Sequence, residues 1–341
     1  MPPRAGRARP NPRRRLTLRS LDRALRVGYR PRAVTESRST ALIAIDWGTT
    51  SARAYCLDAA GAVRDIRSAT LGIGSLKDGN FAFALDTLLD DWRDDGAPRI
   101  ACGMIGSRQG WIEAPYVDCP ADLSLLGSAL ARTPSGELRI VPGARCADSA
   151  GVPDVMRGEE TQLVGAIRSD EAQVVAVLPG THSKWAIVER GCLVEFATFM
   201  TGELYALLLA HSILGRMATS ERTGNAMEAF DRGVARGSAG VGLAHAIFGA
   251  RTLALAGELA AEEVGDWLSG VLIGDEIRSA RDWAREHGVD AGTVRVIGEG
   301  ALVARYGRAL EALDIRAEPG PPAAAATGLF RIAQHAGLLA S

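Results

Sequence analysis

The sequence predicts an α/β protein made of two related lobes, and a strand–turn–strand unit that occurs twice is the first reason. Residues 42–55 form an apolar run that stops at Asp46, turns through Gly-Thr-Thr-Ser and then resumes. Apolar runs of this length, bounded by turn residues, are typical of buried strands. Residues 175–187 can be laid over residues 43–55 without a gap. The two copies lie too far apart for a solenoid repeat, so they indicate a duplicated lobe.

The rest of the chain alternates between strand-like and helical segments, which is the second reason for an α/β fold. Further strands are expected at 61–68, 99–104, 138–143 and 295–298, with loops at 146–154 and 319–322. Helical spacing is found at 81–92, 159–167, 201–211, 225–287 and 323–339. A buried stripe on the longest of these segments is predicted to contain Trp267, Leu268, Leu272, Ile273 and Ile277.

Both turns of the repeated unit have the composition of a phosphate-binding site. Gly48 and Gly180 have no Cβ to keep a ligand from the backbone, and clustered N–H groups and hydroxyls form a concave anion site. Asp46, at the end of its strand, is placed to hold a hydrated Mg²⁺, whereas Leu178 stands at the matching position of the second copy. Each turn alone could be an ordinary polar hairpin tip. Two such turns facing each other indicate a nucleotide held in a cleft between the lobes.

Composition places the chain among ordinary soluble globular proteins. It has 341 residues, of which 47% are apolar and 23% charged, enough for two domains with sizeable cores. No apolar run approaches the roughly 18 residues of a membrane helix. The five cysteines form no Cys-x-x-Cys pair, so buried thiols in a reducing cytoplasm are expected. The five histidines show no metal-ligand spacing.

Residues 1–40 differ from the rest of the chain. They carry twelve arginines and two acids, a net charge of +10, although the whole chain has a net charge of −1. Residues 16–25 could form one short amphipathic helix. Such arms can bind nucleic acid or anionic membranes or act as transit peptides. The simpler interpretation is a disordered extension, or translation assigned from too early a start codon, because the core begins cleanly at Ala41.

Three other segments carry candidate site residues. Arg108 follows a predicted strand in a Gly-rich loop, where α/β folds place ligands, and its guanidinium suits carboxylate or phosphate unless it is a solvated surface charge. Glu159 and Glu160 begin a helix, where acids complement the helix dipole or where one acts as a base toward a substrate hydroxyl. Gly298 and Gly300 form a turn that suits an adenine or ribose, although such turns are common between strand and helix.

Several frequent site types are excluded. The chain has no Gly-x-x-x-x-Gly-Lys-[Ser/Thr] loop and no protein-kinase motifs, so it lacks the two commonest types of ATP site. It also has no Gly-x-Gly-x-x-Gly after a strand and no Gly-x-Ser-x-Gly, which argues against a dinucleotide dehydrogenase and an α/β-hydrolase.

Taken together, the motifs resemble those of the 2-dehydro-3-deoxygalactonokinase family, within the superfamily of sugar kinases, actin and heat-shock ATPases. The resemblance covers the chain from Ala41 onward. It implies two ribonuclease-H-like lobes, a duplicated actin-like ATPase fold, with ATP and Mg²⁺ in the cleft. It also implies phosphorylation of the terminal hydroxyl of 2-dehydro-3-deoxy-D-galactonate. The motifs that carry it are 46–51 (DWGTTS), 104–107 (MIGS), 156–163 (MRGEETQL), 179–185 (PGTHSKW) and 200–204 (MTGEL).

Carried over by position, the resemblance makes Asp46 the acid that organises Mg²⁺ and either Glu159 or Glu160 the catalytic base. It makes Arg108 a substrate-loop arginine suited to the carboxylate of the sugar acid, and it places Trp111 and Arg157 at the substrate. The residues implied in ATP binding are Gly48, Thr49, Thr50, Ser51, Gly180, Thr181, His182, Ser183, Gly298 and Gly300. Glu299, between the last two glycines, is bulkier than the residue that some members have there.

The expected organisation is a basic extension at 1–40, an N-terminal lobe at 41–157 and a C-terminal lobe at 158–341. The kinase interpretation competes with a nucleotide-switched binding protein of the same fold, which would bind ATP without sugar-acid-stimulated ADP release. A nucleic-acid-binding protein that uses the basic arm is a more distant alternative. The gluconate-derived epimer, or another small sugar acid, remains open as the substrate, and a homodimer remains possible.

Overall fold

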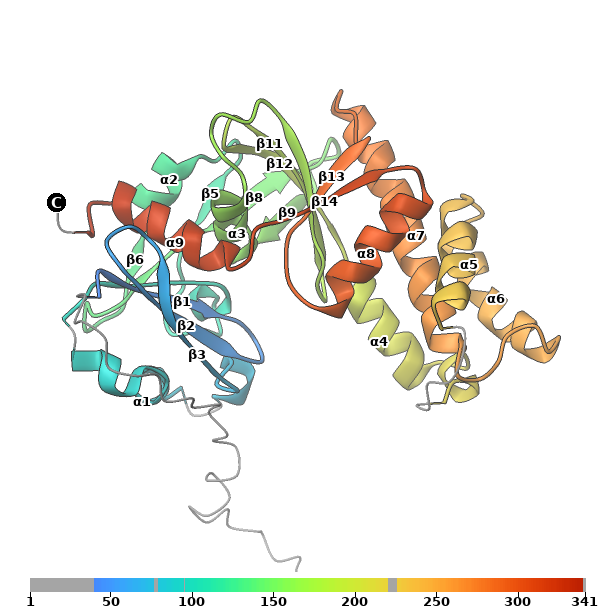
Figure 1. Cartoon of the computed structure of the whole chain (residues 1–341), viewed down its shortest axis with the longest axis horizontal. Helices are drawn as coiled ribbons and strands as arrows, with labels where there is room; N and C mark the ends of the chain where they lie inside the picture. Colours follow the sequence, from blue (N-terminus) through green and yellow to red (C-terminus); the bar gives the residue numbers. More distant parts are fainter. Residues whose placement is uncertain (1–39, 77–78, 95, 220–225, 340–341) are drawn as a thin grey trace, which may run out of the picture.

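The computed structural model describes residues 40–76, 79–94, 96–219 and 226–339. The basic arm at 1–39 and the short helix expected at 16–25 lie outside this range. Figure 1 shows two bodies, each built on a twisted sheet, with the helical bundle of the second body at the far end from β1. No helix in the described ranges is both long and apolar enough to cross a membrane.

A six-stranded sheet forms the first lobe, in the order β3-β2-β1-β4-β7-β6. The central strand β1 pairs antiparallel with β2 and parallel with β4. Its residues Leu42 to Ile45 are completely buried, because helices cover both faces of the sheet. The strands are β1 (Leu42–Trp47), β2 (Ala52–Leu57), β3 (Val63–Ala69), β4 (Arg99–Cys102), β6 (Ala131–Arg132) and β7 (Arg139–Ile140).

Alternate residues of β1 face two different cores. Ile43 and Ile45 pack with α1 (Phe81–Leu89), which begins at Asn80, whose side chain accepts a hydrogen bond from the N–H of Phe83. Leu42 and Ala44 pack on the other face with α9 (Ala324–His335). The predicted strand therefore has the two-residue periodicity of a strand buried on both faces.

The second lobe repeats the central arrangement of the first. Its five-stranded sheet has the order β12-β11-β10-β13-β14, and β10 pairs antiparallel with β11 and parallel with β13, as β1 does with β2 and β4. The predicted duplication is therefore confirmed. The strands are β10 (Val174–Leu178), β11 (Ser183–Glu189), β12 (Cys192–Phe199), β13 (Thr293–Val296) and β14 (Arg316–Pro319).

The gapless alignment of the two hairpins does not extend to their strand register. The last pair of the first hairpin is Trp47 with Ala52, whereas the last pair of the second is Leu178 with Lys184. The second turn is therefore one residue longer, running over 179–183 in place of 48–51. The small and hydroxyl-bearing residues recur at the same sequence positions, but they meet different partners across the strands.

A small third sheet corrects one expectation. Residues 146–154 were predicted to be a loop, but only 148–152 form one, because the two ends of the segment lie in β8 (Gly143–Ala147) and β9 (Pro153–Met156), which pair antiparallel, with β5 (Tyr116–Asp118) beside β8. The short turn between β8 and β9 is held by Asp148, whose Oδ1 accepts hydrogen bonds from the N–H groups of Ala150 and Val152. The turn residues between the two strands interrupt the strand pattern, so the sequence did not reveal the two strand ends.

Helices α3 (Glu159–Ala166) and α9 cross at very short range. A Cβ on Gly165 would lie 1.9 Å from the carbonyl oxygen of Ala324, and a Cβ on Gly328 would lie 1.9 Å from that of Thr161. Helix α9 also packs against β1 and β4 and against α2 (Leu123–Ser128). The chain thus returns to the first sheet after it has built the second, and the lobe boundary at 157/158 stays a prediction.

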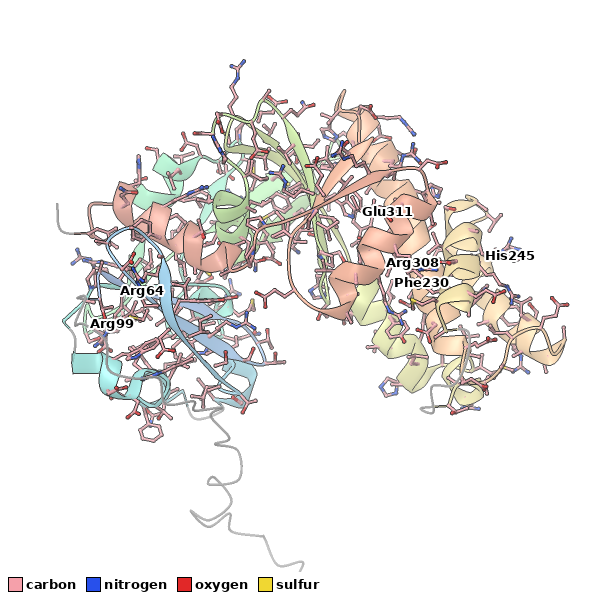
Figure 2. All side chains as sticks on the ribbon, viewed as in Figure 1. Arg64, Arg99, Phe230, His245, Arg308 and Glu311 are labelled. Atoms are coloured by element: carbon pink, nitrogen blue, oxygen red, sulfur yellow. The ribbon has the colours of Figure 1, made fainter. Side chains whose placement is uncertain are left out.

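The helical part of the second lobe packs around one long central helix, α7, whose predicted stripe from Trp267 to Ile277 is buried as expected. Helices α5 and α7 also approach each other through glycine, since a Cβ on Gly270 would lie 2.1 Å from the carbonyl oxygen of Phe230. Arg308 on α8 forms an ion pair with Asp231 on α5, next to Phe230 (Figure 2). The helices are α4 (Thr201–His211), α5 (Ala226–Ser238), α6 (Leu243–Leu255), α7 (Val264–Glu286) and α8 (Ala301–Ala312).

Candidate active site

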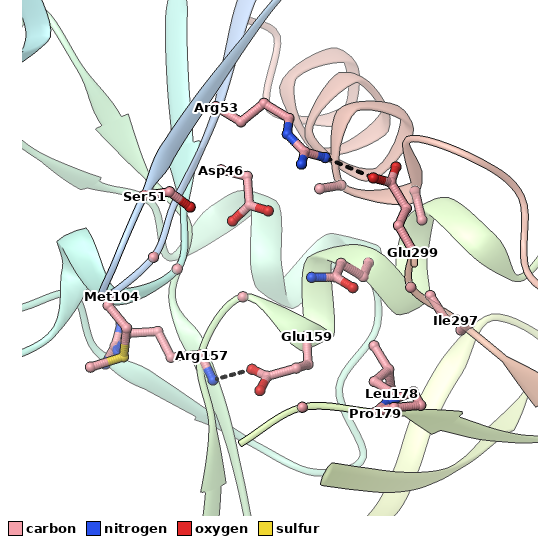
Figure 3. Close-up of a pocket in the computed structure, with 18 of the residues that line it drawn as sticks. Asp46, Ser51, Arg53, Met104, Arg157, Glu159, Leu178, Pro179, Ile297 and Glu299 are labelled. Atoms are coloured by element: carbon pink, nitrogen blue, oxygen red, sulfur yellow. Dashed lines mark hydrogen bonds and ion pairs between the residues drawn. The ribbon is translucent and has the colours of Figure 1, made fainter. Parts of the chain in front are cut away.

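The two hairpin turns line one cleft between the lobes. Its volume is about 480 Å³, and its walls include Gly48 and Thr49 from the first turn and Gly180 and Thr181 from the second. Figure 3 shows the carboxylates of Asp46 and Glu159 on its walls. The central geometric expectation from the sequence, that both turns open onto one crevice, is therefore met.

The first turn is closed and supported by backbone. The N–H of Gly48 donates to the carbonyl of Ser51 at 2.9 Å, and the N–H of Gly74 donates to the carbonyl of Thr49 at 2.9 Å. Gly72 lies so close behind the turn that a Cβ would come within 2.3 Å of the Thr49 carbonyl oxygen. Gly48, Thr49 and Ser51 line the cleft, but Thr50 does not.

The second turn rests on the N-terminus of α4. A Cβ on Gly202 would lie 2.4 Å from the carbonyl oxygen of Gly180, and the N–H of Glu203 donates to the carbonyl of Thr181 at 3.0 Å. Glu203 also holds the ring of His182, with 2.5 Å between Oε2 and Nε2. Gly180, Thr181 and His182 line the cleft, so three of the four residues predicted for this turn are in position.

Ser183, the fourth, faces away from the cleft. It is fully buried, and its hydroxyl lies 2.8 Å from the hydroxyl of Tyr306. Tyr306 donates to Oε2 of Glu276 at 2.7 Å, and the indole N–H of Trp185 donates to Oε1 at 2.8 Å. Burial raises the pKa of Glu276 to about 7 despite these hydrogen bonds. The buried hydroxyl of Ser183 therefore fixes the end of the turn to the core of the second lobe. Its position does not support the predicted contact with a nucleotide.

Asp46 lies at the end of β1, opposite Arg53 in the hairpin. Burial raises the pKa of its carboxyl, the Arg53 cation lowers it, and the Glu299 carboxylate raises it. Arg53 and Glu299 line the same cleft and form an ion pair of 3.0 Å between their side chains (Figure 3). Arg53 was not among the site residues predicted from the sequence, although it pairs directly with Asp46 across the hairpin.

In the structure, the adjacent acids Glu159 and Glu160 point in different directions, whereas the sequence did not distinguish which of them is the base. Glu159 lines the cleft, and its Oε2 accepts a hydrogen bond from the N–H of Arg157 at 3.0 Å. Burial raises the pKa of Glu159, and the Lys184 cation lowers it. Gln162, one helical turn further on α3, also lines the cleft and was missed, although its i+3 spacing from Glu159 was a usable signal.

Glu160 points into the protein and is 2% exposed. Its Oε2 accepts from the N–H of Gly158 at 2.6 Å, and its Oε1 accepts from the hydroxyl of Thr161 at 2.8 Å. Burial, together with the neighbouring Glu159 carboxylate, raises the pKa of Glu160 to about 7. Gly158 holds the turn before α3 at a φ of +110°, a conformation that side chains other than glycine rarely adopt. This backbone turn sends the two carboxylates in different directions.

The three residues predicted at the substrate lie in different surroundings. Arg157 is 8% exposed and lines the cleft. The Arg108 side chain is 87% exposed, lies 3.6 Å from Glu113 and does not line the cleft. Trp111 stacks on Phe81 with 6.2 Å between ring centroids and packs against the first core. Only Arg157 is brought together with the turns and the acids.

A second cavity of about 220 Å³ shares Gly180 with the cleft and is mainly apolar. Gly298 lines the main cleft, and Gly300 begins α8 with a φ of +82° without lining that cleft. The side cavity was not foreseen, because its helices read simply as buried apolar stripes. Its walls include Thr201, Tyr205, Leu272, Ile273, Leu302, Arg305 and Tyr306.

The two sheets have the same strand arrangement, and each carries a hairpin turn at one shared cleft, which is also lined by the acids Asp46 and Glu159. The family model that matches this chain makes the protein a carbohydrate kinase. Comparison with known proteins shows which family of carbohydrate kinases this is. The chain belongs to the 2-keto-3-deoxy-galactonokinase family, whose model matches residues 46–332.

The relatives cover most of the chain. It is 37% identical to the 2-dehydro-3-deoxygalactonokinase of Escherichia coli (strain K12) over 290 residues, which are 82% of this chain and 94% of the relative. It is 37% identical to the probable 2-dehydro-3-deoxygalactonokinase DgoK1 of Rhizobium meliloti (strain 1021), over 80% of this chain and 90% of that protein. A crystal structure of a putative 2-dehydro-3-deoxygalactonokinase protein from Sinorhizobium meliloti superposes with a TM-score of 0.77 at 35% identity, covering 86% and 98% of the two chains.

Proposed function

We propose that this protein transfers the terminal phosphoryl group of ATP to the 6-hydroxyl of 2-dehydro-3-deoxy-D-galactonate, with Glu159 as the base and Asp46 as the acid that organises Mg²⁺. The reaction is supported by family membership and by the names of the relatives. The observation that carries the assignment of roles is that Asp46, Glu159 and both turns share one cleft, whereas Glu160 is turned away from it.

The cleft has the features that a nucleoside triphosphate requires. Backbone at Gly48 and Gly180 is open to a ligand, because Cβ atoms are missing at both positions. The hydroxyls of Thr49, Ser51 and Thr181 add donors around the same space. The apolar side cavity beside Gly180 suits the adenine ring, which prefers flat apolar walls with a few polar contacts.

Asp46 suits Mg²⁺ in the way that kinases hold it. Among the described residues, no three His, Cys, Asp or Glu side chains gather as a metal cage. Mg²⁺ commonly binds through one or two carboxylates, with waters and substrate phosphates completing its shell, so a single acid beside a phosphate turn is sufficient. When bound, Mg²⁺ would neutralise charge on the phosphates.

Glu159 would take the proton from the substrate hydroxyl while that oxygen forms its bond to phosphorus. The bond between phosphorus and the β–γ bridging oxygen breaks, and ADP carries away the electron pair. Burial favours a proton on Glu159, and Lys184 limits the rise of its pKa, so the carboxylate can be charged before reaction and still accept a proton during it. The turns would hold donor and acceptor in line.

A coupled ADP-release assay tests the proposal. Purified protein with ATP and Mg²⁺ would be offered 2-dehydro-3-deoxy-D-galactonate, its gluconate epimer, and plain hexoses and hexonates. Release stimulated most strongly by the galactonate derivative is expected. ATP binding without stimulation by any sugar acid would instead favour the nucleotide-switched binding protein.

A further inference from the structure

Arg157 is a buried cation without an anionic partner. Arg157 directly follows β9 in the sequence, and its Nη2 donates to the carbonyl of Ala114 at 2.8 Å. The guanidinium also lies over the ring of Tyr116, with 4.3 Å from Cζ to the ring centroid. Nε and Nη1 are buried and have no hydrogen-bond partner, and no carboxylate of the described residues forms an ion pair with this side chain.

Such an arrangement is costly unless a ligand completes it. A buried ion without its counter-ion costs several kcal/mol, and each unpaired buried donor adds its own desolvation penalty. The hydroxyl of Ser107 is likewise buried and unpartnered. Ser107 directly follows Gly106, where an added Cβ would lie 3.0 Å from Nη1 of Arg157. The loop that carries Ser107 is therefore in contact with the guanidinium, and unsatisfied side-chain donors on two contacting segments indicate a site for an acceptor group.

Three other cations near the predicted motifs are solvated or already engaged. Arg108 is solvated beside Glu113, and Arg53 pairs with Glu299 at the opposite side of the cleft. Lys184 is buried, and its Nζ donates to the hydroxyl of Thr198 at 2.9 Å. Of the arginines that line the cleft, Arg157 is therefore the one whose charge is uncompensated within the described part of the chain.

We infer that Arg157 receives the carboxylate of the substrate and is the residue that selects sugar acids over neutral sugars. This inference rests on the proposed function, which it deepens. Guanidinium pairs with carboxylate through parallel N–H···O bonds, a geometry that a neutral sugar cannot offer. Met104, which lines the same wall, is flexible enough to move aside as the carboxylate enters (Figure 3).

The backbone ties this cation to the base. The N–H of Arg157 is the donor to Oε2 of Glu159, and one glycine separates the two residues. A substrate held by its carboxylate at Arg157 is therefore positioned relative to Glu159 by a rigid turn. The chemical class selected is a short-chain acid that carries a hydroxyl at the end remote from its carboxylate.

The test compares the sugar acid with its uncharged primary amide in the wild type, Arg157→Gln and Arg157→Lys. Wild-type kcat/KM is expected to favour the acid by at least about 100-fold, since charge-assisted hydrogen bonds are the stronger kind. Arg157→Gln should raise KM for the acid by roughly 10–100-fold, leave KM for ATP within about threefold, and reduce the acid-to-amide ratio below about 10. Arg157→Lys should retain part of the preference.

Arg145→Gln is the matched control, because Arg145 pairs with Asp118 on β5 and does not line the cleft. A KM effect in Arg108→Gln and none in Arg157→Gln would overturn the inference, as would equal affinity of the wild type for acid and amide by calorimetry, which does not depend on any variant folding. Failure of the proposed function looks different, because the wild type would then release no ADP with any sugar acid.

Discussion

Arg53 and Glu299 form an ion pair of 3.0 Å that joins the two lobes at the cleft, with the first residue on β2 and the second in the turn before α8. Both side chains are about half exposed, so water screens the pair and its contribution to stability is small. Its position matters more than its strength, because both charges lie among residues that line the proposed nucleotide site.

We therefore expect Glu299→Gln and Arg53→Gln to change ATP affinity in opposite directions. Removing the carboxylate lowers KM for ATP by about two- to fivefold, because one negative charge near the phosphates is lost, and removing the guanidinium raises it by a similar factor. The free energy of unfolding changes by less than about 1 kcal/mol in either variant. Steady-state kinetics at two salt concentrations measure both effects, and shifts of the same sign would contradict this account.

Asp46→Asn is expected to reduce kcat by about 10³-fold or more, because the amide cannot provide the anionic oxygen on which Mg²⁺ binding to the phosphates depends. Turnover at increasing Mg²⁺ concentration gives the readout, together with circular dichroism to verify folding. Near-normal rates at ordinary Mg²⁺ would remove Asp46 from the proposed site.

The two adjacent acids should differ in their response to the same change. Glu159→Gln is expected to lower kcat by about 10²–10⁴-fold with little effect on KM for ATP, because the base is lost and the phosphate turns remain. Glu160→Gln keeps an acceptor for the N–H of Gly158 and should retain kcat within about tenfold. If Glu160→Gln proves the more damaging variant, the roles must be exchanged.

Glu276 predicts a pH-dependent stability. Its folded-state pKa is raised from 4.5 to about 7, so folding favours the protonated form. Its contribution is fully present below pH 4.5, is lost as the pH rises toward 7 and is constant above that, a change on the order of 3 kcal/mol. Urea unfolding at pH 5 and pH 8 should show Glu276→Gln gaining stability relative to the wild type at the higher pH. An unchanged difference would argue against a raised pKa.

The crossing of α3 and α9 predicts a packing effect. Gly165→Ala should destabilise the protein by about 1–3 kcal/mol or more, because the new methyl group has no room beside Ala324. Gly307→Ala on α8 is the control, since its Cβ would lie 4.0 Å from the nearest atom, and it should be neutral or stabilising by up to about 1 kcal/mol. Thermal unfolding of both variants distinguishes the effect of crowding on stability from the effect of helix propensity.

The fold was predictable because its signals are local. Apolar runs such as residues 42–45 predict buried strands, and the repeated turn predicts the duplicated lobe. What could not be predicted depends on orientation. Adjacent residues on a helix differ in direction by about 100°, so only packing decides that Glu159 faces the cleft and Glu160 faces the core.

The arginines illustrate the same limit. Arg108 and Arg157 both follow strand-like segments near motif residues, and composition cannot tell a solvated guanidinium from a buried one. Ser183 matched Ser51 in sequence, but the register of the second hairpin and the hydroxyl of Tyr306 draw it into the core. Such differences arise from contacts between segments far apart in the chain.

Helix α9, which covers one face of the first sheet, has a consequence for biosynthesis. The strand β1 leaves the ribosome early, but its apolar residues Leu42 and Ala44 meet Leu329 and Ile332 only after the whole second lobe has been translated. A nascent chain must therefore carry an uncovered apolar sheet through most of its synthesis, the state that chaperones recognise, and its folding is completed by the joining of distant segments.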